Sequence, residues 1–276
     1  MDDIVSLKNE NKTVFDKYNV ASYGTAILTS AFPGIKEYYS LLEKVLTTPA
    51  DELLNELKIS GLRGRGGAGF PIAIKLEGCK KENSKQKFIV CNADEGDPGA
   101  WVNRVVMESD PHRLIEGLLI GAYATGATWG WIYLREEYPL AYERLNKAIA
   151  DCRERGILGE DALGTGVKFD CEVVRGAGAY VCGDETGLIS SINDERGMPR
   201  IKPPFPAQSG VLGKPTNVNN VETYACVTTL LRVGAETFST VGTEANRGTK
   251  MFTVSGACVR TACIEVPFGI TVNEPL

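Results

Sequence analysis

Glycine and arginine are concentrated in residues 61–70, where five glycines and two arginines occur in ten positions. Each glycine costs chain entropy on folding, so a cluster of this density indicates that something approaches the backbone closely. Exposed peptide N–H groups together with fixed positive charge suit a phosphate. We therefore interpret this stretch as a loop that binds a phosphate-bearing ligand, with a flexible surface loop as the alternative.

Three of these glycines, Gly64, Gly66 and Gly69, satisfy the pattern G-x-G-x-x-G. A dinucleotide-binding fold needs a strand before that pattern. The preceding residues 49–58 instead predict a helix, because they start with proline and acids and end with lysine. The loop is therefore not the usual Rossmann fingerprint, and the P-loop pattern G-x-x-x-x-G-K-[ST] does not occur in the chain.

An acidic turn follows a short apolar strand predicted over residues 87–91. It places Asn92 beside three acids, Asp94, Glu95 and Asp97. Open α/β sheets bind ligands at the carboxyl ends of their strands. We expect this turn to form hydrogen bonds with hydroxyl and ring N–H groups of a ligand, and a solvated acidic turn is the alternative.

A second group of candidate residues lies in the later half of the chain. Residues 198–206 contain four prolines, which stiffen a loop that carries Lys202 and Phe205. A proline-rich connector with a solvated lysine is the alternative. Residues 219–222 then predict the start of a helix, with capping-box spacing from Asn219 to Glu222.

The elements that must position these residues alternate between strand and helix. Strands are predicted over 87–91, 129–134 and 169–175. Helices are predicted over 35–47, 49–58, 110–125, 139–155 and 219–233, and a further helix is predicted to end at about residue 192. This alternation predicts an α/β fold with helices on the faces of the sheet. From residue 248 the pattern changes to short strands over 250–255 and 264–272. We therefore divide the chain into a larger domain at 1–246 and the start of a smaller one at 247–276.

Composition excludes several functional classes. A net charge of −5 argues against nucleic-acid binding, and no apolar run reaches the length of a membrane span. The chain starts with acidic and polar residues rather than a signal peptide, which favours a cytoplasmic protein. Its eight cysteines contain no C-x-x-C pair, and its only histidine, His112, follows Asp110 and Pro111 as a helix-start residue. We predict no metal site within this chain and reduced, packed thiols.

Six motifs in order resemble one family: SGLRGRGGAGFP at 60–71, CNADEG at 91–96, ESDPH at 108–112, GAGAY at 176–180, KPPFP at 202–206 and VNNVET at 218–223. This is the flavin-bearing, NADH-oxidising subunit shared by respiratory complex I, NAD-reducing and electron-bifurcating hydrogenases, and NAD-dependent formate dehydrogenases. The resemblance runs from about residue 45 to the end. It implies an atypical Rossmann-like FMN-binding α/β domain followed by the start of a β-grasp-like (SLBB) domain.

The resemblance also implies site residues. For FMN they are Gly64, Gly66, Lys75, Asn92, Asp94, Asn219 and Asn220; for NADH they are Gly67, Phe70, Asp97, Glu185, Lys202 and Phe205. No catalytic acid or base is implied, because the cofactor carries the hydride chemistry, and Glu95 and Glu185 are candidate orienting residues. Where the family usually has aromatic residues after Lys75, this chain has Leu76 and Gly78.

The implied function is electron input: NADH is oxidised, or NAD+ reduced, and single electrons pass to iron–sulfur centres of a larger redox complex. A thioredoxin-like iron–sulfur subunit and further iron–sulfur subunits are the implied partners. The family's own four-iron cluster is expected only in the region that follows in the family or in partner subunits, because C-x-x-C-x-x-C is missing here.

Two other functions remain open at this point. One is a non-redox enzyme that handles a nucleotide or phosphate with the glycine loop, the acidic turn and a magnesium ion. The other is a scaffold that has lost its flavin. The acids at 94, 95, 97 and 185 favour NADH over NADPH, although Arg65 and Arg200 lie close in sequence to the same loops.

Overall fold

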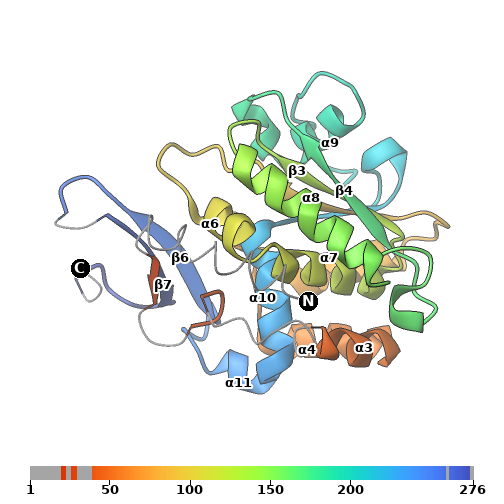
Figure 1. The fold of residues 1–276 in the computed structure, drawn as a ribbon, viewed down its shortest axis with the longest axis horizontal. Helices are drawn as coiled ribbons and strands as arrows, with labels where there is room; N and C mark the ends of the chain where they lie inside the picture. Colours follow the sequence, from red (N-terminus) through yellow and green to blue (C-terminus); the bar gives the residue numbers. More distant parts are fainter. Residues whose placement is uncertain (1–19, 23–25, 30–38, 259–260, 274–276) are drawn as a thin grey trace.

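The larger part of the molecule is a four-stranded parallel sheet in the order β4-β3-β2-β5. The structure is a computed structural model that describes residues 20–22, 26–29, 39–258 and 261–273. The strands are β2 (Phe88–Ala93), β3 (Trp129–Leu134), β4 (Asp170–Arg175) and β5 (Thr216–Asn220). Helices alternate with these strands along the chain, so the predicted α/β class is confirmed (Figure 1).

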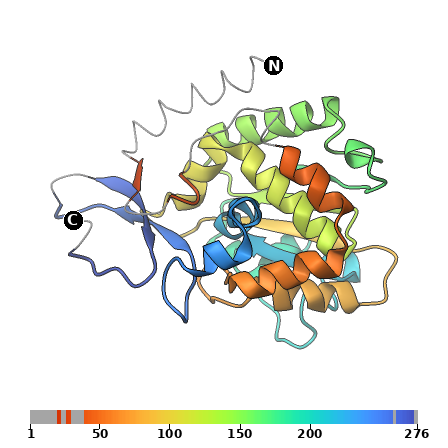
Figure 2. The ribbon, with the colours of Figure 1, turned by 90° about the horizontal axis from the view of Figure 1, so that it is seen from below.

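Helices cover both faces of this sheet. Figure 2 shows one face covered by α3 (Ser40–Thr47), α4 (Ala50–Ser60), α7 (Pro111–Thr125) and α8 (Pro139–Glu154). The remaining helices are α5 (Ile72–Lys81), α6 (Val102–Ser109), α9 (Glu185–Ile192), α10 (Val221–Val233) and α11 (Ala235–Ser239). On the opposite face, Leu188 and Ile189 of α9 pack against Phe88 and Val90 of β2.

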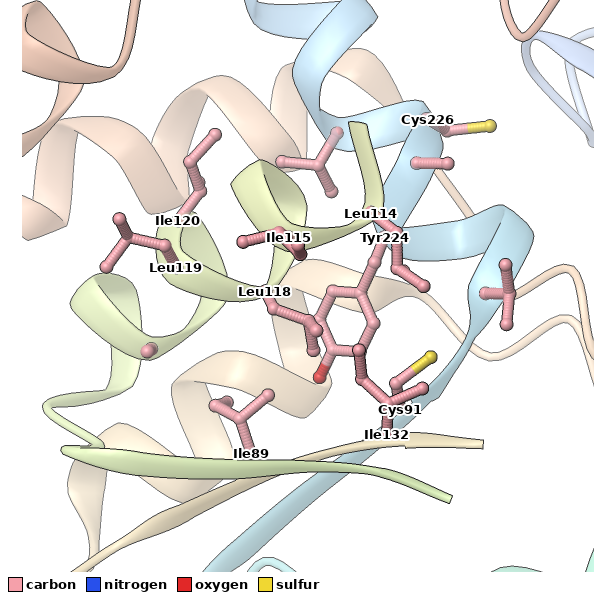
Figure 3. Close-up of a cluster of buried hydrophobic side chains, with 14 of the residues drawn as sticks. Ile89, Cys91, Leu114, Ile115, Leu118, Leu119, Ile120, Ile132, Tyr224 and Cys226 are labelled. Atoms are coloured by element: carbon pink, nitrogen blue, oxygen red, sulfur yellow. The ribbon is translucent and has the colours of Figure 1, made fainter. Parts of the chain in front are cut away.

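The main core lies where α7 and α10 meet the sheet (Figure 3). Nearly every residue of α7 is buried, which agrees with a helix that is apolar on most sides. The ring of Tyr224 from α10 reaches between α7 and the strands, toward Ile89 and Ile132. The two helices cross closely at Gly117, because a Cβ built there would lie 2.2 Å from the carbonyl oxygen of Tyr224.

The start of α7 follows the prediction made from the sequence. Asp110 is the N-cap, its side chain accepts from the N–H of Arg113, and Pro111 occupies the first helical turn. His112 is the helix-start residue that we expected. Its buried Nδ1 lies 2.6 Å from the hydroxyl of Tyr39.

A second, smaller sheet has the order β1-β7-β6. It contains β1 (Val20–Ser22), β6 (Thr249–Val254) and β7 (Ala262–Pro267), and it lies to one side of the α/β part in Figure 1. The two later strands correspond to those predicted, whereas β1 was not predicted. The buried carboxylate of Glu265 accepts the N–H groups of Ile27, Leu28 and Thr29, each at 2.9 Å. Residues 20–22 and 27–29 therefore belong with the small sheet, although the sequence predicted that the smaller domain contains only residues 247–276.

Several element predictions need correction. The start of the predicted helix 35–47 lies outside the described residues, and the described helix begins at Ser40. Three helices, α5, α6 and α11, and strand β5 were not predicted. The expected capping residue Asn219 belongs to β5, and the N-cap of α10 is Asn220, whose Oδ1 accepts from the N–H of Glu222 at 3.0 Å. Within the described residues, no helix is both long and apolar enough to cross a membrane.

The close crossing of α7 and α10 yields a stability prediction. Gly117→Ala should lower the free energy of unfolding by about 3 kcal/mol, because the new methyl group meets backbone that cannot rotate away. The matched control is Gly78→Ala in α5, where a Cβ would lie 3.9 Å from its nearest neighbour. That change should stabilise by about 1 kcal/mol through helix propensity. Urea denaturation of both variants measures the difference, and equal effects would contradict the crossing geometry.

Candidate functional site

Several of the predicted site residues meet at the carboxyl edge of the parallel sheet. The register between β2 and β5 pairs Asn92 with Asn220. The Asn92 amide donates to the carbonyl of Gly183 at 2.8 Å, which brings the segment before α9 to the same edge. Two asparagines from distant parts of the sequence therefore lie side by side where ligands bind in open α/β sheets.

The glycine loop joins α4 to α5, so the prediction that a helix rather than a strand precedes it is confirmed. Helix α4 ends at Gly61, whose φ of 65° lies in the left-handed region that glycine favours. The loop then folds back on itself: the N–H of Gly64 donates to the carbonyl of Phe70 at 2.9 Å, and Arg63 Nη1 donates to the carbonyl of Gly69 at 2.9 Å.

The tip of this loop touches the end of β5. A Cβ built on Gly66 would lie 3.1 Å from the Cβ of Asn220, so glycine permits the close approach. At Gly67 and Gly69, with φ of 131° and 61°, a Cβ would meet nothing within 4 Å. The structure thus brings Gly66 and Asn220 together and leaves Gly67 at an open rim with Phe70, whose side chain is 51% exposed.

The three acids of the turn after β2 have different surroundings. Glu95 is tied to the start of α6, where its carboxylate accepts the N–H groups of Asn103 and Arg104 at 2.9 and 3.1 Å. Asp97 accepts the hydroxyl of Tyr180 at 2.9 Å in an exposed position. Glu95, a candidate orienting residue from the sequence, therefore holds a helix in place in this structure.

Asp94 is the acid with unused hydrogen-bonding capacity. Its Oδ2 is buried and, among the described residues, has no hydrogen-bond partner. Burial raises the pKa of this carboxyl to about 6, against the opposing effect of the Arg135 guanidinium. A buried acceptor without a donor is costly in a folded protein. Asp94 is thus the clearest candidate here for an acceptor of a ligand N–H or O–H group.

Glu185 joins two predicted site residues. Its Oε2 accepts from Lys75 Nζ on α5 at 3.0 Å, and its Oε1 accepts from Lys202 Nζ on the proline-rich loop. Burial alone would raise the pKa of Glu185, but the two ammonium groups hold it below its usual value. Lys75, Glu185 and Lys202 therefore form one charged cluster, with one carboxylate between two cations.

Sequence reasoning did not identify Tyr180 as a neighbour of the acidic turn. A Cβ on Gly96 would lie 2.7 Å from the Tyr180 ring, so the ring rests on the acidic turn at a glycine. The side chain is 69% exposed. Its position at the end of the GAGAY motif was the available signal, but its partner Asp97 is 83 residues away in the sequence.

The other predicted residues divide into buried and exposed ones. Asn219 is buried, and its amide donates to Asn217 Oδ1 of the same strand at 2.6 Å. Phe205 is 53% exposed on the proline-rich loop. The two arginines named for the NADPH question are both engaged: Arg65 is buried, and Arg200 pairs with Glu195.

Comparison with known proteins gives consistent matches. Residues 57–229 match the family model described as the Nuo51 FMN-binding domain. NADP-reducing hydrogenase subunit HndC of Solidesulfovibrio fructosivorans is 52% identical over 236 residues, covering 86% of this chain and 48% of that protein. The mitochondrial NADH dehydrogenase (ubiquinone) flavoprotein 1 of Dictyostelium discoideum is 45% identical over 234 residues, covering 84% of this chain and 49% of that protein.

A solved structure matches as well. A crystal structure of an NAD+-reducing NiFe-hydrogenase in the H2-reduced state has a TM-score of 0.82 and 34% identity, covering 93% of this chain and 43% of that chain. The chain spans about half the length of the curated relatives it matches.

The state of Asp94 yields a pH prediction. Because its folded pKa of about 6 exceeds the ordinary 3.8, the folded protein binds this proton more tightly than the unfolded chain. Its contribution to stability is therefore complete below about pH 4 and is lost as the pH rises through 6. The carbon chemical shift of the Asp94 carboxyl, followed by NMR in the ligand-free protein, should titrate near pH 6. A midpoint near pH 4 would show that the carboxyl is well solvated or paired.

Proposed function

Because the chain belongs to the family of the Nuo51 FMN-binding domain, we propose that it is the electron-input flavoprotein subunit of a larger redox complex, which oxidises NADH or reduces NAD+. The observation that carries this proposal is the register that sets Asn92 beside Asn220, against which Gly66 of the glycine loop packs. Asp94 follows Asn92 by two residues and carries a buried oxygen that has no partner among the described residues. Family membership also favours this redox function over a magnesium-dependent nucleotide enzyme.

The residues at the sheet edge fit a flavin nucleotide. Asn92, Asp94 and Asn220 supply amide and carboxylate groups, which suit the polar edge of a flavin ring and its ribityl hydroxyls. The unpartnered Oδ2 of Asp94 provides an acceptor that such a ligand would satisfy. Asn219 is buried in the same strand as Asn220, and its amide donates to Asn217 Oδ1.

The FMN phosphate fits the glycine loop and Lys75. The peptide N–H of Gly66 lies on a loop that approaches Asn220 closely, whereas the N–H of Gly64 donates to the carbonyl of Phe70 and shapes that loop. An ammonium group has three N–H donors, and Glu185 uses one donor of Lys75. Lys75 therefore retains donors for an anion while Glu185 fixes its position.

The NADH site is proposed along the open rim beside the flavin. Phe70 and Phe205 each expose about half of their side chain, which suits stacking on adenine. Gly67 allows close approach at the loop tip, Asp97 accepts ribose hydroxyls, and Lys202 with Glu185 contacts the remaining polar groups of the dinucleotide.

The chain's own residues bind and align the two nucleotides, and they need not transfer protons. FMN, when bound, supplies the chemistry that takes a hydride from NADH and releases the electrons singly. The protein contributes alignment and electrostatics. Glu185 keeps two lysines at fixed positions, and Glu95 fixes the turn that carries Asp94 and Asp97 by binding the start of α6.

We propose NADH rather than NADPH as the preferred nucleotide. Asp94, Asp97 and Glu185 would repel a 2′-phosphate. Arg65 is buried and donates to carbonyls of the small sheet, and Arg200 pairs with Glu195. The name of the HndC relative nevertheless refers to NADP, so both nucleotides belong in the test.

The proposed partners follow the family. We propose a thioredoxin-like iron–sulfur subunit and further iron–sulfur subunits as electron acceptors, in the cytoplasm. The relatives' names describe a component of a hydrogenase and the flavoprotein of an NADH dehydrogenase.

The function is tested by purifying the protein with FMN and adding NADH or NADPH without oxygen. We expect flavin absorbance that bleaches with NADH, at a kcat/KM at least about tenfold above that with NADPH, since one unfavourable charge contact of about 1.4 kcal/mol gives a factor of ten. A protein that stays colourless after reconstitution would refute the redox function. A preference for NADPH would refute only the choice of nucleotide.

Removing the Phe205 ring tests the proposed NADH site. A stacked aromatic ring contributes about 0.5–1.5 kcal/mol beyond its buried area, so Phe205→Ala should raise the KM for NADH about tenfold with FMN content unchanged. The matched control is Phe252→Ala on β6, where a phenylalanine of similar exposure lies in the small sheet. Steady-state kinetics with NADH measures both, and an unchanged KM in Phe205→Ala would remove Phe205 from the site.

A further inference from the structure

Arg65, which directly follows Gly64 and precedes Gly66 in the loop, is buried, and its guanidinium donates to the carbonyls of Thr249 and Arg247. We propose that Arg65 is a positioning residue for the nucleotide site: it fixes the tip of the glycine loop by tying it to strand β6. The small sheet thereby sets the geometry of the loop that binds phosphate. This inference rests on the proposed function for what the loop binds, and on the structure alone for how the loop is held.

The guanidinium of Arg65 uses each of its three nitrogens on a backbone carbonyl. Nε donates to Thr249 at 3.0 Å, Nη1 to Arg63 at 2.9 Å and Nη2 to Arg247 at 2.6 Å. The guanidinium carbon also lies 4.7 Å from the centre of the Phe268 ring. The residue is 5% exposed. One side chain of the loop therefore connects with residues 247–249 at the start of β6 and with the residue after β7.

Strand β6 is itself firmly held, so it is a suitable anchor. The buried carboxylate of Glu222 in α10 accepts the N–H of Met251 at 2.8 Å and the ammonium of Lys250. Glu265 of β7 accepts the hydroxyl of Thr249. Because α10 starts directly after β5, the anchor for the loop is tied to the same elements that carry Asn220.

The hydrogen bonds from Gly64 to Phe70 and from Arg63 to Gly69 join the loop to itself but do not attach it to β6. Gly64, Gly66 and Gly67 have no side chains, and glycine has the largest conformational freedom of any residue. The peptide N–H of Arg65 donates to Thr223 Oγ1 at 2.8 Å, which holds one point of the backbone. The guanidinium supplies the second point. Together, these two attachments of Arg65 fix the orientation of the backbone where Gly66 packs against Asn220. They thereby also fix the orientation of the neighbouring peptide N–H groups.

The sequence suggested that the arginines of the loop suit a phosphate, but the surroundings of Arg65 account for an arginine at this position without a ligand contact. A phosphate contact would need an exposed guanidinium, whereas this one is enclosed by carbonyls and a ring. A Cβ built on Gly248 would lie 2.9 Å from Arg65 Nη2, so the start of β6 leaves room for the guanidinium by lacking a side chain. Shape and hydrogen bonding therefore both match arginine at this position, and lysine could satisfy only part of the set.

The test compares Arg65→Lys with wild type in the full protein, with and without FMN. Lysine keeps the charge but cannot reach three carbonyls in a planar arrangement. We expect the amides of residues 66–69 to exchange hydrogen at least about threefold faster in the ligand-free variant, and the Kd for FMN to rise about tenfold. Binding of FMN should slow exchange in residues 249–254 of wild type and not in the variant, because Arg65 connects the two regions.

The matched control is Arg153→Gln. Arg153 also links a helix to a strand, through Asp170 and the carbonyl of Cys171, but does so away from the site. It should lower Tm without changing the Kd for FMN or the exchange of residues 66–69. If Arg65→Lys does not fold, Phe268→Leu removes the ring and keeps the hydrogen bonds, and should raise the Kd about two- to threefold.

Two outcomes are separable. Unchanged loop exchange in a folded Arg65→Lys protein, or in Phe268→Leu where that variant replaces it, overturns the positioning role, whatever the ligand. Faster loop exchange in the variant combined with no FMN binding by wild type supports the anchor and refutes the proposed function.

Discussion

The parallel pairing of β2 with β5 is the constraint on which the rest of the site depends. Its register sets Asn92 beside Asn220, although 128 positions separate them in the numbering. The strands end at the same edge, so the acidic turn that follows β2 and the helix that follows β5 leave the sheet together. The glycine loop then completes the site by packing Gly66 onto Asn220. A slip of β5 by one residue against β2 would turn Asn220 to the opposite face of the sheet from Asn92.

Buried carboxylates connect the surrounding segments to that edge. Glu95 binds the start of α6, Glu222 binds β6, and Glu265 binds residues 27–29, in each case by accepting main-chain N–H groups. A buried carboxylate is costly unless it is hydrogen-bonded, and these three are. In none of the three cases do the carboxylate and the N–H groups come from adjacent strands of one sheet. The arrangement of the loops therefore depends on polar contacts inside the fold as well as on the apolar core beneath Tyr224.

The sequence predicted the types of most of the main elements, because these depend on local patterns. Strand β2, the capped start of α7 and the helix before the glycine loop follow from periodicity and capping residues. Helix α5 was missed because it contains Gly78 and has no polar N-cap, and α6 is short and rich in valine. The partners of Glu95, Arg65 and Tyr180 could not be predicted, since they depend on which distant segments meet in space. The N-cap of α10 is Asn220 rather than the predicted Asn219, because β5 continues to Asn220. This position could not be predicted from the local sequence either.

The central claim is that one flavin nucleotide lies at the carboxyl edge of β2 and β5, against the glycine loop. An experimental structure of the protein with FMN tests this most directly. We predict FMN with a donor group within about 3 Å of Asp94 Oδ2, in contact with Asn220, and with its phosphate on the N–H groups of the glycine loop. FMN bound elsewhere, for instance on the small sheet, or an Asp94 oxygen that stays without a partner, would contradict the account.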